Sequence, residues 1–223
     1  MHHFLNLTPL WLTLKVAGLA TLAAVVVGVA LAFLMARRQF WGLEWLDAFC
    51  TLPLVLPPTV LGYYLIVVWG RNGWLGHWLH EVCGISLMFT WQGAVLASAL
   101  VSFPLVFKSA RAAFEEVDRS LENVARTLGL SEGAVFRRVS LPLALRGILA
   151  GTMLAFARGM GEFGATLMVA GNLPGKTQTL SLAIYSAVQA GNDTLALALV
   201  LLTSAACIVI LVTSGKILQA SLK

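Results

Sequence analysis

Charged residues are scarce in this sequence. Asp, Glu, Lys and Arg together make up 11% of its 223 residues, whereas soluble domains carry about a quarter. Hydrophobic residues account for 59% of the chain, and its mean hydropathy is +0.86. A bilayer core requires about 20 mostly apolar residues per helix, and the chain divides into such stretches with short connections. The composition excludes a soluble globular protein and predicts one all-α transmembrane domain over residues 1–223.

Residue patterns that hold metals or nucleotides are also missing. The three cysteines form no Cys-x-x-Cys pair and have no histidine at a spacing suited to a metal, so we expect no metal site. The chain has no complete Gly-x-x-x-x-Gly-Lys-Ser/Thr phosphate loop, so we expect it neither to hydrolyse ATP nor to bind a cofactor. Its net charge of +5 fits the positive-inside rule of membrane proteins, so nucleic acid is not an expected partner. These absences predict a protein that is not an enzyme.

Five apolar stretches are long enough to cross a bilayer. Their ranges are 10–35, 52–69, 88–107, 145–170 and 195–212. The run 177–190 is too polar for a span, and we expect an outer or re-entrant helix there. Of the 15 Lys and Arg residues, all but Lys15, Arg71, Arg158 and Lys176 fall on one side of this arrangement. The positive-inside rule then predicts a multi-pass protein of the plasma membrane with its amino end outside and its carboxyl end cytoplasmic.

The second span begins with Leu-Pro-Leu-Val-Leu-Pro-Pro. Its prolines remove backbone donors, so this helix must be broken or kinked where protein or water can satisfy the freed carbonyls. Broken helices at membrane depth often belong to transport pathways, and the alternative is a kink that serves packing alone. By polarity and position, the candidates for a translocation path are Pro57, Pro58, Thr59, Thr166 and Ser181.

The fourth span carries two features that favour close packing. Gly147 and Gly151 have the Gly-x-x-x-Gly spacing that lets helices approach closely. Arg158 and Glu162 are four residues apart on one helical face and can pair, which lowers the cost of placing either charge in the membrane. We expect a structural ion pair; the alternative is that Arg158 adds positive potential to an anion path.

Residues 118–142 form the longest charged segment and have the pattern of two short helices joined at a glycine. Asp118 can cap the first helix, and Gly129 suits the left-handed residue that ends it. A second helix is expected to begin at Ser131 and to stop at Pro142. The first helix carries an apolar stripe whose residues are spaced at i, i+3, i+4 and i+7: Leu121, Val124, Ala125 and Leu128. The segment is predicted to be a compact docking element rimmed by arginines.

This segment resembles the Glu-Ala-Ala loop of ABC importer permeases, in which a glycine is followed at fixed spacing by an aliphatic residue, leucine and proline. In that family the loop is a cytoplasmic coupling helix that seats in a cleft of the ATPase. The resemblance implies that the coupling residues are Glu122, Asn123, Ala125, Gly129, Leu141 and Pro142. One departure is that the glutamate of the family motif aligns with Asn123, while Glu122 occupies the preceding position.

Two further segments, Leu-Pro-Leu-Val-Leu-Pro-Pro-Thr-Val-Leu-Gly-Tyr and Phe-Ala-Arg-Gly-Met-Gly-Glu-Phe-Gly-Ala-Thr, are similar to segments of molybdate permeases. The resemblance implies a type I importer permease fold and a homodimer in a bacterial or archaeal inner membrane. It also implies two ATPase subunits that bind ATP and Mg, and a periplasmic molybdate-binding protein. The alternatives are a permease for tungstate or sulfate, or an ATP-independent channel or secondary transporter.

Overall fold

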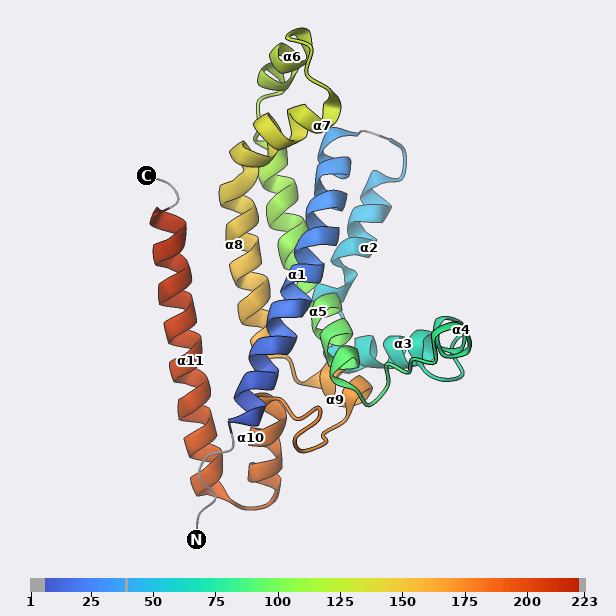
Figure 1. The fold of residues 1–223 in the computed structure, drawn as a ribbon, viewed down its shortest axis with the longest axis vertical. Coiled ribbons are helices and arrows are strands. Elements are labelled where there is room, and N and C mark those ends of the chain that lie inside the picture. Colours follow the sequence, from blue (N-terminus) through green and yellow to red (C-terminus); the bar gives the residue numbers. More distant parts are fainter. Residues whose placement is uncertain (1–6, 39, 221–223) are drawn as a thin grey trace.

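The structure, a computed structural model, describes residues 7–38 and 40–220, and within those ranges its regular elements are all helical. The long helices run alongside one another, with short helices at both ends and at one side (Figure 1). The long helices are α1 (Thr8–Arg37), α5 (Trp91–Glu115), α8 (Leu141–Met160) and α11 (Asp193–Ala220). The short elements are α2 (Leu43–Val55), α3 (Pro58–Trp69), α4 (Trp74–Cys83), α6 (Arg119–Thr127), α7 (Glu132–Val135), the π-helical turn η1 (Phe136–Ser140), α9 (Gly164–Ala170) and α10 (Leu180–Gln189).

Within residues 7–38 and 40–220, four stretches are long and apolar enough to cross a membrane as single helices, and the bent pair α2 and α3 raises the number to five. The expected count of about five spans is therefore confirmed. The expected second span is corrected, because its first half begins at residue 43 and its second half turns away by 113°. The fourth is corrected too: it runs over Glu132–Met160, and a break at residues 161–163 separates it from α9. Residues 180–189 form the short helix α10 inside the run that was predicted to be re-entrant or interfacial.

Small side chains hold α1, α5 and α8 together. Most of the buried positions of α1 are alanines, glycines and threonines, which let its backbone approach its neighbours. A Cβ atom added to Gly147 would lie 2.5 Å from the Cβ atom of Ala113, and one added to Gly151 would lie 2.6 Å from that of Ser109. The close contact predicted from the Gly-x-x-x-Gly spacing is confirmed, and the facing helix is α5.

Larger side chains fill the core at the end of the bundle that carries α6. Phe107 and Phe114 are completely buried there, and the Phe33 ring meets Phe114 edge-on at 5.2 Å between centroids. The same ring lies 4.6 Å from that of Phe136, the first residue of η1. The start of the fourth span is therefore fixed against α1 and α5 by aromatic contacts, which stabilise a pair beyond the area that it buries.

Helix α11 contrasts with this core. It lies along one side of the bundle (Figure 1), and only 11% of its most apolar 18-residue stretch is buried. Its exposed residues are predominantly large and aliphatic, which suits a helix surrounded by lipid or by other apolar helices.

Candidate functional site

Helix α6 projects from one end of the bundle, and its two ends are fixed by local sequence (Figure 1). The Asp118 carboxylate accepts a hydrogen bond of 2.8 Å from the Ser120 N–H, which confirms the predicted cap. That bond lowers the pKa of the Asp118 carboxyl below its ordinary value. At the other end Gly129 has φ +83°. The N–H groups of Gly129 and Leu130 donate to the carbonyls of Arg126 and Ala125, the pattern that closes a helix at a left-handed glycine.

The outer face of α6 is apolar and unpaired within the described chain. Leu121, Val124 and Leu128 are 49%, 56% and 75% exposed, so three of the four residues of the predicted stripe face outward. Ala125 is the exception, because it is buried and shares the inner face of α6 with Glu122. Exposed apolar side chains gathered on one small helix are typical of a surface that another protein covers.

The Glu122 side chain, expected as a coupling residue, points inward. It is 2% exposed and accepts hydrogen bonds of 2.6 Å from Arg37 Nη2 and of 2.6 Å from Ser140 Oγ. Asn123 lies on the surface instead, where its Oδ1 accepts from Arg126 Nη1 at 2.9 Å. Arg37 and Ser140 were not predicted as site residues. In the sequence, Arg37 and Arg38 indicate only how the chain is oriented in the membrane. No local pattern links residue 37 to residue 122.

The second helix of the segment 118–142 was predicted to stop at Pro142, and this prediction is wrong. The chain continues from α7 through η1 into α8 without a break, with Leu141 and Pro142 in the first turn of α8. In η1 the Leu141 N–H donates to the Phe136 carbonyl, five residues back. Proline is tolerated in the first turn of an α-helix, and Pro142 occupies such a position directly after the π-helical turn.

Two helix breaks meet in the half of the bundle that lies away from α6 (Figure 1). The first lies at Pro57, between α2 and α3, where the Pro57 carbonyl accepts from the N–H groups of Val60 and Leu61. The second is the segment 161–163 before α9. A Cβ atom on Gly164 would lie 3.0 Å from the Pro58 Cβ, so the two breaks are in direct contact.

The predicted path residues are only partly brought together there. Pro57 and Thr59 are exposed at the first break, and Pro58 is half-buried against α9. Thr166 lies in the adjacent α9 but is 1% exposed, so it does not line an open passage in this conformation. Ser181 lies in the first turn of α10, a helix that packs against α11 and α1.

Arg158 and Glu162 are paired. Arg158 Nη1 lies 2.8 Å from Glu162 Oε2, and the Glu162 side chain is almost completely buried. The sequence placed both on one continuous helix, yet α8 ends at Met160 and Glu162 lies in the break. Its second oxygen, Oε1, accepts from the Ala165 N–H at 2.9 Å, so the carboxylate also caps α9. An acidic group at a helix N-terminus is favoured by the helix dipole.

The loop before α10 contains the tripeptide Gly175-Lys176-Thr177. A phosphate loop would need a further glycine at position 170, which is Ala170, and a preceding strand. The tripeptide instead forms part of a turn in which Thr177 is buried and its Oγ1 accepts from the Leu173 N–H at 3.0 Å. The loop is therefore a packed connection, with no cradle for a nucleotide.

An apolar bundle with an exposed short helix at one end and two broken helices in contact has the features of a membrane transport subunit. The chain belongs to the family of binding-protein-dependent transport system inner membrane components, whose family model matches residues 24–223. It is a transport subunit, not an enzyme.

Among curated relatives, the molybdenum transport system permease protein ModB of Escherichia coli (strain K12) is 49% identical over 178 residues, 80% of this chain and 78% of that protein. ModB of Mycobacterium tuberculosis is 42% identical over 204 residues, 91% of this chain and 77% of that protein.

Solved structures show the fold. A subunit of the MetNI methionine ABC transporter in an inward-facing conformation superposes with a TM-score of 0.75 at 18% identity, covering 99% of both chains. A subunit of a bacterial alginate ABC transporter, in complex with an alginate-bound periplasmic protein, gives 0.70 at 16% identity, covering 93% of this chain and 76% of that one. The fold is that of the type I ABC importer permeases, as the sequence predicted.

Proposed function

We propose that this chain is the permease subunit of an ATP-driven importer that carries molybdate across the inner membrane. The observation that carries the proposal is identity of 42–49% to several molybdenum transport permeases over most of the chain. The partners follow from the same family. They are a second copy of this chain, two cytoplasmic ATPases that bind ATP and Mg, and a periplasmic molybdate-binding protein.

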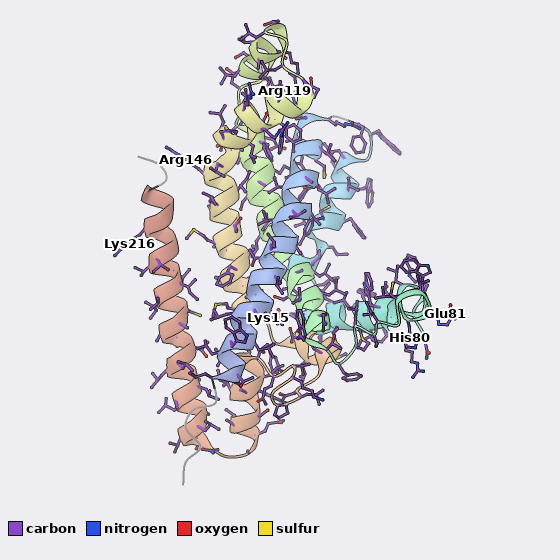
Figure 2. The ribbon with its side chains drawn as sticks, in the orientation of Figure 1. Lys15, His80, Glu81, Arg119, Arg146 and Lys216 are labelled. Carbon is purple, nitrogen blue, oxygen red and sulfur yellow. The ribbon has the colours of Figure 1, made fainter. Side chains whose placement is uncertain are left out.

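The exposed face of α6 is the proposed seat for the ATPase. Its three exposed apolar residues offer a surface that a cleft in a partner would desolvate, and Arg126 at its rim is held by Glu132 at 2.7 Å. The cytoplasmic side would then be the end that carries α6. Arg119 and Arg146 lie toward that end, while Lys15 lies in the opposite half (Figure 2). This distribution agrees with the positive-inside rule and with an outside amino end.

The two touching helix breaks are the proposed part of the path that changes shape. Helix ends and hydroxyls can offer donors to a dianion without trapping it, whereas a fixed unpaired lysine or arginine would bind it tightly. Arg158 is occupied by Glu162, so it does not present a free cation. Thr166 in α9 is 1% exposed in this conformation, so it could meet the ion only after α9 had moved relative to its neighbours.

The test is uptake of radiolabelled molybdate into proteoliposomes that contain the permease with its ATPase, supplied with the binding protein and ATP. We expect uptake that requires all three components and is competed by tungstate more strongly than by sulfate. Uptake by the permease alone would instead establish a channel or secondary transporter. Uptake of sulfate in preference to molybdate would refute the substrate while leaving the class intact.

A further inference from the structure

The Glu122 carboxylate joins three elements, of which α1 is far from the other two along the chain. Arg37 in the last turn of α1 and Ser140 at the end of η1 each donate to Glu122 Oε1 at 2.6 Å. Glu122 Oε2 lies 3.7 Å from Arg126 Nη2 on α6 itself. The exposed fractions of the Arg37 and Glu122 side chains are 14% and 3%, so the pair is shielded from solvent. A buried carboxylate of this kind needs such partners, because burial strongly disfavours an unpaired charge.

Other contacts of α6 are few. It packs on α7 and η1, and its polar links to α1 are the Arg37 bond and a longer one of 3.4 Å from Arg119 Nη2 to the Ala36 carbonyl. Helix α1, by contrast, packs along α5 and α8 through its small residues. Glu122 therefore lies at the place where a small projecting helix is tied to the rigid core.

The π-helical turn gives Ser140 its direction. Successive residues of an α-helix are rotated by about 100° around the axis, so the additional residue that a π turn accommodates re-aims every side chain beside it. In η1, the turn ends at Ser140, whose hydroxyl is buried and directed at Glu122. π-Helical turns often occur at functional sites. Here the turn and the carboxylate meet at one hydrogen bond.

We infer that Arg37, Glu122 and Ser140, which we call the latch, are positioning residues that transmit movement of α6 to α1. This inference rests on the proposed function, since α6 is the seat of the ATPase in that proposal. Docking uses the outer face of α6, whereas the latch uses its inner face. Cutting the latch therefore leaves ATPase binding and ATP hydrolysis in place but lets α6 move without carrying α1 with it. The consequence is ATP hydrolysis uncoupled from transport.

The experiment measures molybdate uptake and ATP hydrolysis together in proteoliposomes of the complete importer. The variants are Arg37→Gln, Glu122→Gln, both together, and Ser140→Ala. The matched control is Arg38→Gln, which removes the neighbouring, exposed positive charge. For Arg37→Gln and Glu122→Gln we expect the ratio of molybdate transported to ATP hydrolysed to fall on the order of tenfold, a typical size for coupling between sites. The double variant should fall no further than the single ones, because both remove one interaction.

Assembled complex per membrane and ATP hydrolysis should stay close to the unmodified values in all variants. An unchanged ratio in Glu122→Gln, or an equal fall in Arg38→Gln, would overturn the latch. If Arg37→Gln and Glu122→Gln yield too little complex, Ser140→Ala becomes the deciding variant, because it keeps the ion pair and removes only the hydrogen bond from Ser140 to Glu122. An unchanged ratio of molybdate transported to ATP hydrolysed in Ser140→Ala would then overturn the inference. Failure of the proposed function would look different, since the unmodified importer would then transport no molybdate at all.

Discussion

Replacing Gly129 is expected to weaken attachment of the ATPase through the shape of the backbone, not through the size of the new side chain. Gly129 ends α6 at φ +83°, and a Cβ atom there would meet nothing within 4 Å. Space within the chain is therefore available, and the obstacle is conformation alone. For residues other than glycine the left-handed region costs about 1–2 kcal/mol, with asparagine the best tolerated.

A cost of this size shifts the ratio of correctly capped to uncapped α6 by about 5- to 30-fold. Alanine should therefore lose much of the docked population, and valine more, because its β-branch adds crowding next to the backbone. Asparagine should retain most of it despite being larger than alanine. The order of binding expected is glycine, asparagine, alanine and then valine.

Co-purification of the ATPase with tagged permease from detergent-solubilised membranes measures this order directly, with total permease as the reference. Gly133→Ala is the matched control, because Gly133 lies in the same segment, in ordinary helical conformation and with open space around it. If asparagine abolished binding while alanine preserved it, steric contact with the ATPase would explain the result. The argument from backbone conformation would then be refuted.

Three further outcomes are expected. Gly147→Ala should sharply reduce the amount of folded protein, since its Cβ would lie 2.5 Å from a side chain of α5, whereas Gly18→Ala, with nothing within 4 Å, should not. Arg158→Ala should lower the free energy of unfolding by about 3 kcal/mol, because it leaves the carboxylate of Glu162 buried without its cation. A protein in which the two residues are exchanged should be no more stable, since an arginine at position 162 cannot accept the hydrogen bond that caps α9. The Asp118 carboxyl, which caps α6, has a lowered pKa, so the stability that it adds to the helix is present above the ordinary pKa and is lost only as the pH falls through the lowered one. ATPase attachment should therefore stay constant between about pH 5 and 8. A fall within that range would contradict the assignment of Asp118 as the cap.

Features that depend on neighbouring residues could be predicted from the sequence. Apolar length predicted the number of spans, the prolines at residues 57 and 58 predicted the break between α2 and α3, and Asp118 and Gly129 predicted the ends of α6. The angle of 113° at the break could not be predicted, because α3 packs on α9 and α5, whose positions a single sequence does not give. Pro142 was misread because proline ends a regular helix but is tolerated after a π-helical turn, which has no sequence signature of its own.

The inward direction of Glu122 shows a second limit. Periodicity places it on the same side as Ala125, but it does not say which side of a nearly free helix faces the protein. The partner that decides this, Arg37, is 85 residues away. Contacts of this range leave no trace in a single sequence, so a charged residue next to an apolar stripe is naturally assigned to the surface.

The separation between Arg37 and its partners also orders events during synthesis. At about 5–20 residues per second, Glu122 follows Arg37 by about 4–17 seconds, and Ser140 comes later still. For that interval the end of α1 carries a guanidinium without its carboxylate, while α6 and its glycine cap do not yet exist. Until Gly129 has been synthesised, the growing chain therefore lacks the capped helix that we propose as the seat of the ATPase. If the latch acts as we infer, movement of α6 can be passed to α1 only after all three of its residues have been made.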